Sequence, residues 1–376
     1  MTLQRLSGDS RQAEHWCCQL AASAEATRVL LLLAGTETAA VPGISAAGAT
    51  PESRRLTAAA DAELLLLGPS LPRPHALPPL PAGVSPALIA RVVVEQLGLQ
   101  PLVVDAGAAV PPAVPHLQLG LKPARCLSTG QAMPAAQVQQ LLALGRRWGR
   151  QLARRAQPLL LAECVPGGTS TAQAVLQGLG LEVAGLVSGS LREPAHALKA
   201  ELVRCGLAAA QLREPASAVA VLAAVGDPMQ PLAAGLVQAA ALAGLPVLLA
   251  GGSQMAAVLA LALELTAAAE RPLLTSRVAI ATTAWVAAEP SSNLAALLQL
   301  LQRRWGCEPL AFAAGLRFGC CRSPQLQAFE QGFVKEGVGA GGLAALWQLS
   351  GRSPETLAGA CDQACALLHR SLGGAS

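Results

Sequence analysis

The sequence predicts an α/β fold of three layers, in which a doubly wound, mostly parallel, Rossmann-like sheet is covered by helices on both faces. Short apolar runs alternate with Ala/Leu-rich segments of helical length along most of the 376 residues. This alternation is typical of parallel sheets wound in right-handed crossovers. The composition agrees, because 52% of the residues are hydrophobic but only 2% are aromatic. The apolar content is therefore mostly Ala, Leu and Val, as in buried parallel strands.

Eight apolar runs are predicted as strands because each is short and bounded by turn residues. In chain order they are Arg28–Ala34, Glu63–Gly68, Pro101–Asp105, Pro158–Ala162, Leu181–Val187, Ala218–Val225, Pro246–Ala250 and Arg277–Thr282. The helices predicted between them include Ser85–Leu97, Ala135–Ala156, Gln230–Ala243 and Met255–Ala268. Ligands in such folds bind beyond the carboxyl ends of the strands, so the residues after each run are the candidate site.

The alternation of strands and helices stops near residue 304. We predict an α/β core in residues 1–304 and a smaller, mainly helical part in residues 305–376, against which the N-terminal helix packs. The second part holds Lys335–Gly342, where a glutamate stands among glycines that allow a ligand to approach closely. A helix C-cap with a flexible turn explains the same pattern.

Charge and hydropathy exclude several classes of partner. The net charge is only +4, and no aromatic residues are interleaved with the basic ones, so we expect no nucleic acid. One arginine cluster has helical spacing and is interpreted as a solvated or interface face: Arg146, Arg147, Arg150, Arg154 and Arg155. The N-terminus lacks the pattern of a secretory signal. The long uncharged stretch Val237–Leu263 is broken by Gly244, Pro246 and a Gly251-Gly252 turn, which argues against a membrane span. We therefore expect a cytoplasmic protein.

The ten cysteines show no pair with the spacing of a zinc site. Two groups could bind a metal: His15 with Cys17 and Cys18, and Cys361 and Cys365 with His369. Buried free thiols are the simpler interpretation for a chain of this length. We predict neither a metal nor a cofactor.

The stretch Pro158–Gly180 is the clearest local sign of function. Its apolar run ends at Glu163, followed by a Pro166-Gly167-Gly168 turn and then Thr169, Ser170 and Thr171 at the start of a helical segment. A glycine turn before a helix N-terminus presents free N–H groups and the positive end of the helix dipole to an anion. Hydroxyl residues also cap helices, so a phosphate site and a plain strand–helix turn fit this stretch equally well.

Similar turns follow the other runs, and together they suggest a groove for a polar, phosphorylated ligand. Their residues include Gly35-Thr36, Ser188-Gly189-Ser190, Gly226-Asp227 and Gly251-Gly252-Ser253. The sequence contains neither a Walker A motif nor GxGxxG, so the fingerprints of ATP cradles and dinucleotide sites are absent.

Four motifs resemble one known family. They are AGTET with PGISAAGATP (Ala34–Thr38 and Pro42–Pro51), E-x-VPGGT (Glu163–Thr169), GDPMQP (Gly226–Pro231) and KEGVGAGG (Lys335–Gly342). In this order they resemble the nicotinate-nucleotide:dimethylbenzimidazole phosphoribosyltransferases, and most closely their archaeal and cyanobacterial branch. The resemblance implies transfer of phosphoribosyl from nicotinate mononucleotide to a lower-ligand base, 5,6-dimethylbenzimidazole or adenine. The products would be nicotinate and an α-riboside 5′-phosphate, and the latter would enter the nucleotide loop of a cobamide. It also implies a homodimer.

The resemblance assigns roles to individual residues. Glu336 corresponds to the general base, Glu163 faces the sugar, and Ser85 lies in the base pocket. The predicted phosphate ligands are Gly167, Gly168, Thr169, Ser170 and Lys199. The remaining predicted contacts with substrate are Gly189, Ser190, Gly226, Gly251, Gly252, Gly337 and Gly339.

The chain departs from the bacterial motifs of this family in three places. Thr or Ser replaces an Asn of the phosphoribosyl loop, Ser292 or Asn293 replaces a His, and Ala250 replaces an Asp. Two alternatives therefore stay open. One is a non-catalytic protein that binds a nucleotide or a cobamide precursor, and the other is a different phosphoribosyl or nucleoside enzyme.

Overall fold

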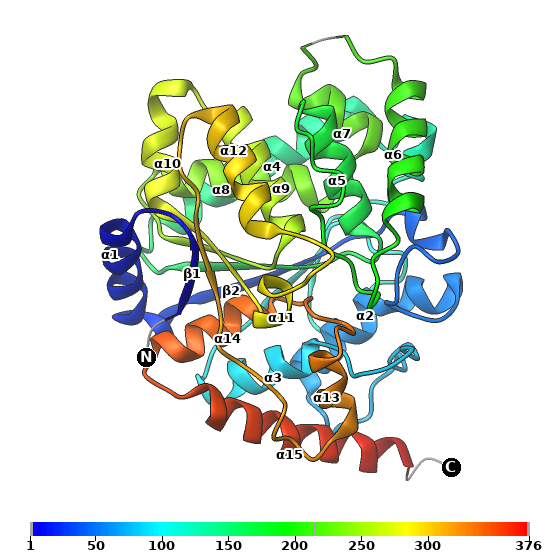
Figure 1. The fold of residues 1–376 in the computed structure, drawn as a ribbon, viewed down its shortest axis with the longest axis vertical. Helices are drawn as coiled ribbons and strands as arrows, with labels where there is room; N and C mark the ends of the chain where they lie inside the picture. Colours follow the sequence, from blue (N-terminus) through cyan, green and yellow to red (C-terminus); the bar gives the residue numbers. More distant parts are fainter. Residues whose placement is uncertain (1–2, 214, 374–376) are drawn as a thin grey trace.

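A computed structural model describes residues 3–213 and 215–373 as an eight-stranded sheet between two layers of helices (Figure 1). The strands lie in the order β1-β8-β7-β6-β5-β2-β3-β4, and all neighbours are parallel except β1 and β8. Their bounds are β1 Gln4–Ser7, β2 Arg28–Leu33, β3 Leu102–Asp105, β4 Leu117–Gln118, β5 Leu159–Cys164, β6 Val247–Ala250, β7 Val278–Thr282 and β8 Leu310–Ala313. The predicted fold class is confirmed.

The helices divide between the two faces of the sheet. In chain order they are α1 Ser10–Ala21, α2 Pro51–Leu67, α3 Ala87–Gln96, α4 Ala135–Ala153, α5 Gly168–Gly178, α6 His196–Ala210, α7 Ala218–Val225, α8 Met229–Leu242, α9 Ser253–Glu264, α10 Arg271–Arg277, α11 Ala284–Ala287, α12 Leu294–Trp305, α13 Pro324–Glu330, α14 Ala340–Leu349 and α15 Pro354–Gly373. One face carries α4, α5, α7, α8, α9 and α12, and the other carries α1, α2, α3, α14 and α15 (Figure 1).

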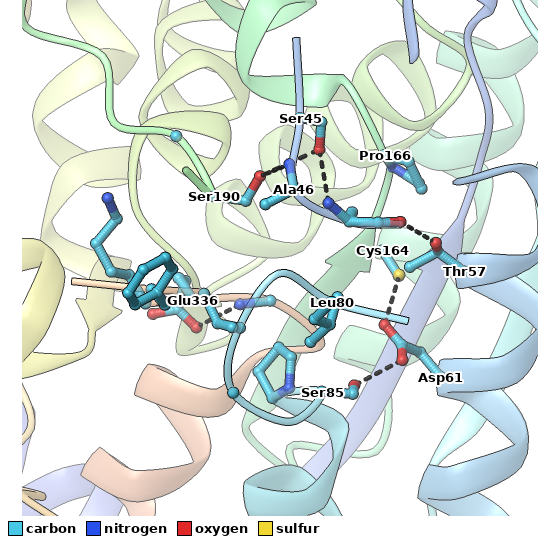
Figure 2. Close-up of a pocket in the computed structure, with 18 of the residues that line it drawn as sticks. Ser45, Ala46, Thr57, Asp61, Leu80, Ser85, Cys164, Pro166, Ser190 and Glu336 are labelled. Carbon is cyan, nitrogen blue, oxygen red and sulfur yellow. Dashed lines mark hydrogen bonds between the residues drawn. The ribbon is translucent and has the colours of Figure 1, made fainter. Parts of the chain in front are cut away.

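The winding of the chain reverses between β2 and β5. From β2 it continues to β3 and β4 on one side, and then returns to β5, β6, β7 and β8 on the other. Such a reversal leaves a crevice beyond the carboxyl ends of the two central strands, which is where α/β sheets bind ligands. The cavity in Figure 2 lies at this point, next to the last residues of β5.

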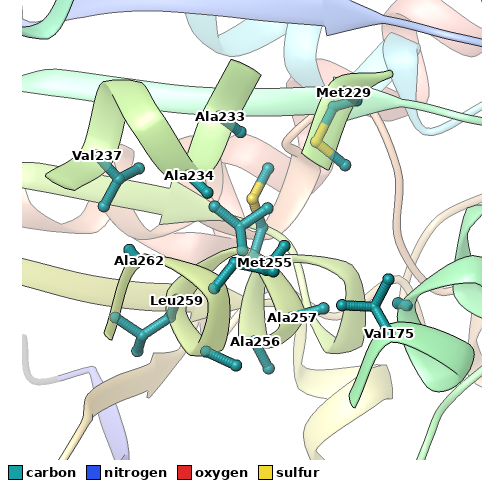
Figure 3. Packing of buried hydrophobic residues seen from close by; sticks show 14 of the residues in the cluster. Val175, Met229, Ala233, Ala234, Val237, Met255, Ala256, Ala257, Leu259 and Ala262 are labelled. Carbon is teal, nitrogen blue, oxygen red and sulfur yellow. The ribbon is translucent and has the colours of Figure 1, made fainter. Parts of the chain in front are cut away.

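Side chains alternate along the strands and supply two cores. In β2, Leu30 and Leu32 join the core under α8 and α9, whereas Val29, Leu31 and Leu33 join the core under α2 and α3. Small residues allow the helices to approach closely, and Figure 3 shows side chains of α9 packed against those of α8, with Val175 of α5 beside Ala257. This dense packing explains how a chain with few aromatics fills its interior.

Three of the predicted strands are wrong. Glu63–Gly68 falls in helix α2 and its C-cap, Ala218–Val225 forms α7, and Leu181–Val187 contains no strand. Short apolar runs fit a buried helix and a buried strand equally well, because periodicity does not separate the two. The caps decide here: Thr50 forms a capping box at the start of α2, and Ser217 caps α7. The strands β1, β4 and β8 were not predicted.

The C-terminal part of the chain is joined closely to the core. Strand β8 extends the same sheet, β1 pairs with it, and α1 contacts α14. The predicted boundary after residue 304 stays a prediction. Residues 374–376 of the predicted helical tail lie outside the described residues.

The stretch Val237–Leu263 forms the end of α8, the buried strand β6, a glycine turn and most of α9, as predicted. Over residues 3–213 and 215–373, no helix is long and apolar enough to cross a membrane.

Candidate active site

A cavity of about 310 Å³ opens at the switch point of the sheet. Its walls come from six regions of the chain: residues 45–47, the middle of α2, residues 77–86, the turn after β5, residues 188–190 and residues 333–337. The turn after β6, Val286 of α11 and the end of α15 complete the lining. Figure 2 shows Glu336 on one side of this space and Asp61 on the other, with Leu80 and Ser85 between them.

The turn after β5 leads directly into helix α5. Gly167 lies just before the helix with φ 79°, and a Cβ atom there would lie 3.0 Å from the backbone nitrogen of Ala39. Glycine is therefore required both by the conformation and by the space. Gly167, Gly168 and Thr169 line the cavity, so the N-terminus of α5 points into it. Ser170 does not line the cavity, and its buried Oγ has no hydrogen-bond partner in the described part of the chain.

Glu163 is the last but one residue of β5 and is 5% exposed. Its carboxylate accepts hydrogen bonds from the backbone N–H of Val165 at 2.9 Å and from Nε2 of Gln254 at 2.9 Å. The pKa of Glu163 is raised to about 8, mainly by burial. The nearby carboxylates of Asp227 and Glu336 contribute to the rise, and these hydrogen bonds oppose it. Glu163 is therefore mostly protonated at neutral pH in the free protein.

Glu336 lies in a loop that is held in place by hydrogen bonds to the Glu336 carboxylate. Oε1 accepts the N–H groups of Gly337 and Gly341, and Oε2 accepts the Thr282 hydroxyl and the N–H of Thr283, all at 2.9–3.1 Å. Burial raises the pKa of Glu336 above its ordinary value, and these four hydrogen bonds oppose the rise. The carboxylate is thus preorganised on the cavity wall.

The backbone around Glu336 is strained. Val334, Lys335 and Val338 have φ of 68°, 62° and 53°. The left-handed region is unfavourable for side chains with a Cβ, especially branched ones, and costs about 1–3 kcal/mol per residue. Such strain persists only where surrounding contacts hold it, and it is frequent at functional sites.

The Ser188-Gly189-Ser190 turn forms a polar wall of the cavity, opposite the apolar wall made by Leu77–Leu80 and Val84. Ser190 Oγ accepts the N–H of Ala46 at 2.9 Å and lies 3.1 Å from Ser45 Oγ, so the PGISAAG segment meets this turn (Figure 2). Lys199 lies behind the turn, 1% exposed, with Nζ donating to the carbonyl of Ser188 at 2.8 Å. Burial lowers the pKa of Lys199 to about 8.

Asp61 forms the polar end of the other wall. Its carboxylate accepts the Ser85 hydroxyl at 2.6 Å and the Cys164 thiol at 3.5 Å, and burial raises its pKa to about 6. Ser85 Oγ also accepts the N–H of Ala87, so this hydroxyl is already paired. The rest of this wall is apolar and includes Leu77–Leu80 and Val84.

Most of the predicted site residues meet in this cavity. Those that line it are Ser85, Glu163, Gly167, Gly168, Thr169, Gly189, Ser190, Gly252, Glu336 and Gly337. Those that do not line it are Ser170, Lys199, Gly226, Gly251 and Gly339. Their roles toward substrate stay predictions.

The residues outside the cavity support it. Gly226 precedes Asp227, whose buried carboxylate accepts the Thr171 hydroxyl of α5 at 2.6 Å. Gly339, with φ 73°, brings the start of α14 against β5, where a Cβ atom would lie 2.7 Å from Ala162. A Cβ atom on Gly342 would lie 2.3 Å from the Cβ of Ala250, so this contact leaves no room for the Asp that the bacterial motif has there.

Sequence reasoning missed several polar residues of the site. Asp61, Gln254 and Lys335 line the cavity, and Glu289 pairs with Lys335. A carboxylate inside the Ala- and Leu-rich run of α2 was a usable signal for Asp61, because charges on an apolar helix face are rarely buried without a function or a partner. No local pattern indicated the pairing of Lys335 with Glu289.

The cysteines and histidines form no metal centre that the structure describes. All ten cysteines are free, and Cys361 and Cys365 are buried in the packing of α15. Among the described residues, no group of three or more His, Cys, Asp or Glu side chains could hold a metal ion.

The chain matches a family model described as phosphoribosyltransferase over residues 87–298. It is 52% identical over 345 residues to a UPF0284 protein of Prochlorococcus marinus (strain MIT 9313), covering 89% of this chain and 85% of the relative. A UPF0284 protein of Parasynechococcus marenigrum (strain WH8102) is 53% identical over 344 residues, with 89% and 86% covered. The chain belongs to the nicotinate-nucleotide:dimethylbenzimidazole phosphoribosyltransferase family.

Solved structures support the fold. CobT from Thermus thermophilus aligns with a TM-score of 0.56 at 20% identity, covering 96% of this chain and 98% of that one. A second structure from the same organism, a nicotinate-nucleotide-dimethylbenzimidazole phosphoribosyltransferase, gives a TM-score of 0.56 at 19% identity, with 98% and 94% covered. The family resemblance predicted from the sequence motifs is confirmed, and the relatives are cyanobacterial proteins.

Proposed function

We propose that this protein transfers the 5-phosphoribosyl group of nicotinate mononucleotide to a ring nitrogen of a lower-ligand base. One observation carries the proposal: a preorganised carboxylate, Glu336, shares a cavity with a glycine turn at a helix N-terminus. Group transfer to a heterocycle requires a base near an anion site, and this cavity offers both.

The nucleotide would occupy the polar side of the cavity. Its 5′-phosphate would lie at the turn Gly167–Thr169, where the dipole of α5 favours an anion, with the Ser188–Ser190 turn beside it. Lys199 would add positive charge from behind that turn, since its Nζ is held by the Ser188 carbonyl.

Glu163 would face the ribose. With its pKa near 8, the neutral carboxyl can exchange hydrogen bonds with a ribose hydroxyl. The positive charge of the bound pyridinium ring favours the carboxylate form, which then faces the charge that develops on the sugar as nicotinate leaves.

The acceptor base would lie on the apolar side, between Leu77–Leu80 and Val84. A ring nitrogen attacks the anomeric carbon from the α face, and the bond to the nicotinate nitrogen breaks. Glu336 takes the N–H proton of the attacking ring, a step typically worth ~10²–10⁴ in rate. The products are an α-riboside 5′-phosphate and nicotinate.

We further propose 5,6-dimethylbenzimidazole or adenine as the base, a role in building the nucleotide loop of cobamides, and a homodimer in the cytoplasm. The family membership supports the choice of base, the role in cobamide synthesis and the dimer. The cavity, with one apolar and one polar wall, is compatible with either base.

Product analysis tests the proposal. The purified protein is incubated with nicotinate mononucleotide and each base in turn, and nicotinate and the riboside phosphate are measured by chromatography and mass spectrometry. The expected result is equimolar release of both products with at least one base. Nucleotide binding without nicotinate release from any base would favour the non-catalytic alternative.

A further inference from the structure

The loop that carries Glu336 is attached to a buried ion pair that the proposed reaction does not use. Nζ of Lys335 donates to Oε1 of Glu289 at 2.7 Å and to the carbonyl of Leu191 at 2.7 Å. The side chains of Lys335 and Glu289 are only 2% and 3% exposed. A charge pair this deep is rarely the most stabilising choice, so its presence calls for a specific role.

Glu289 connects this pair to the polar wall of the cavity. Its carboxylate also accepts the hydroxyls of Ser188 at 2.5 Å and Ser292 at 2.6 Å. Ser188 begins the turn proposed for the donor, and the N–H of Val334 donates to the carbonyl of Ser190 in the same turn at 3.3 Å. The donor turn and the loop of Glu336 are therefore held by one set of contacts.

The contacts of Lys335 hold a loop whose backbone is strained. Lys335 itself has φ 62°, between Val334 at 68° and the residue that carries the carboxylate. Its carbonyl accepts the Thr283 hydroxyl at 2.6 Å, and Thr283 N–H in turn donates to Glu336. Lys335 is thus fixed at both its side chain and its backbone, immediately before Glu336.

We propose that Lys335 and Glu289 are positioning residues, which hold the strained loop so that Glu336 faces the acceptor while the donor turn keeps its place. This inference rests on the proposed function, in which Glu336 is the base. The pair does not touch the reacting atoms; it acts through Glu336 and through the Ser188–Ser190 turn.

The test compares two buried lysines on either side of the donor turn, Lys199 at the Ser188 carbonyl and Lys335 at the Leu191 carbonyl. Lys335→Met removes the ammonium that holds the Glu336 loop, and Lys199→Met removes the one that donates to the Ser188 carbonyl. We expect Lys335→Met to lower kcat about 10- to 100-fold when kcat is calculated per competent nucleotide-binding site, because a small displacement of a catalytic group slows the reaction strongly. Its KM for nicotinate mononucleotide should change less than threefold or so. Lys199→Met should show the opposite pattern, with KM affected more than kcat.

The number of competent sites is measured by calorimetric titration with nicotinate mononucleotide. A purely structural role for Lys335 would reduce this number and leave kcat per site unchanged, and that result would overturn the inference. The same change in KM and kcat for both lysine variants would also overturn it.

The double variant Lys335→Met/Glu289→Gln covers the case in which the single variant does not fold. It removes both charges of the pair, so neither Lys335 nor Glu289 is left as a buried ion without its partner. Its hydrogen exchange is compared with that of the wild type at Gly337 and Gly341, whose N–H groups donate to Glu336. Faster exchange confined to this loop supports the inference, and unchanged exchange contradicts it. Because this readout needs no turnover, a wild type that transfers no phosphoribosyl would refute the proposed function and still leave the loop contacts tested.

Discussion

Replacing Glu336 by Gln tests the central assignment with a small change in shape. The carboxylate accepts four hydrogen bonds, two at each oxygen. An amide has one oxygen and one NH₂ group, so it can satisfy Gly337 and Gly341 but then turns its NH₂ toward Thr283 N–H. The Thr282 hydroxyl can rotate to accept, whereas the Thr283 N–H is left unpaired.

One unpaired buried donor costs about 1–3 kcal/mol, partly offset because a neutral amide is cheaper to bury than a carboxylate. The melting temperature should therefore fall by only a few degrees, since 1 kcal/mol corresponds to about 2–4 °C or less in a chain of this size. Turnover should fall by ~10²–10⁴, because the variant cannot accept the proton of the attacking ring. The KM for nicotinate mononucleotide should remain nearly intact.

The matched control is Thr282→Val. It removes one hydrogen bond to the carboxylate and costs about 1.5–3 kcal/mol, similar to Glu336→Gln, but it keeps the base. That hydrogen bond lowers the pKa of Glu336, so its loss raises the pKa and moves the acidic limb of the kcat–pH profile to higher pH. Activity of Thr282→Val should recover as the pH rises, and activity of Glu336→Gln should not.

Release of nicotinate, followed by chromatography from pH 5 to 9, is the assay. Unchanged turnover in Glu336→Gln would refute the reasoning outright. A loss that is equal in both variants and does not recover with pH would mean that the loop geometry, and not the proton acceptor, limits the rate.

Three further predictions use the same assays. Because burial lowers the pKa of Lys199 to about 8, the wild-type kcat/KM for the nucleotide should fall as pH rises through 8. Lys199→Met should remove this fall and should raise the KM for the nucleotide but not the KM for the base. An equal rise of both KM values would mark Lys199 as structural. Glu163 has its pKa raised from 4.5 to about 8, so the free energy of unfolding falls as pH rises from 4.5 through 8, and Glu163→Gln should flatten this dependence in thermal melts. The amide of Gln254, whose Oε1 has no partner among the described residues, can flip to pair with the new side chain, so the variant should still fold. If the stability of Glu163→Gln depended on pH as steeply as that of the wild type, the pKa assignment would be contradicted. Gly341→Ala would place a Cβ atom 2.2 Å from the carbonyl carbon of Thr282 and should lower turnover about 100-fold, whereas Gly359→Ala, with nothing within 4 Å, should not; equal activities would refute the close packing.

Two of the three departures from the bacterial motifs have local explanations. Ser292 donates to Glu289, and Asn293 caps α12, so the residues at the lost His now serve the wall of the site and a helix start. Ala250 lies against Gly342, where a larger side chain does not fit. The carboxylates proposed for chemistry, Glu163 and Glu336, are both present in the cavity.

Local chemistry made the fold and the donor turn predictable. The alternation of apolar runs and helical segments depends on neighbours in sequence, so it identified β2, β3, β5, β6 and β7 and the parallel architecture. The turn after β5 was equally predictable, because glycines are typical of turns with positive φ and hydroxyl residues are typical of helix starts. The edge strands β1 and β4 were missed, since β1 (QRLS) contains no apolar run and β4 has only two residues.

Other features depend on pairing across the chain. The run at Ala218–Val225 becomes a helix because of its cap and its packing, which composition does not reveal. The hydrogen bond between Cys164 and Asp61 spans 103 positions, and the ion pair of Lys335 with Glu289 spans 46, so no local spacing marks either of them.

The sequence by itself therefore determined the architecture and the sheet edge at which the cavity opens, because strand endings and glycine turns depend on neighbouring residues. Glu163 stood out at the end of a predicted strand, whereas Glu336 was assigned through the family resemblance. Only the tertiary structure decided how those glutamates behave. The burial that raises the pKa of Glu163, the Thr282 and Thr283 donors to Glu336 and the ion pair behind its loop come from segments far apart in the chain. Desolvation and hydrogen bonding act through space, so they appear only when the fold brings these segments together.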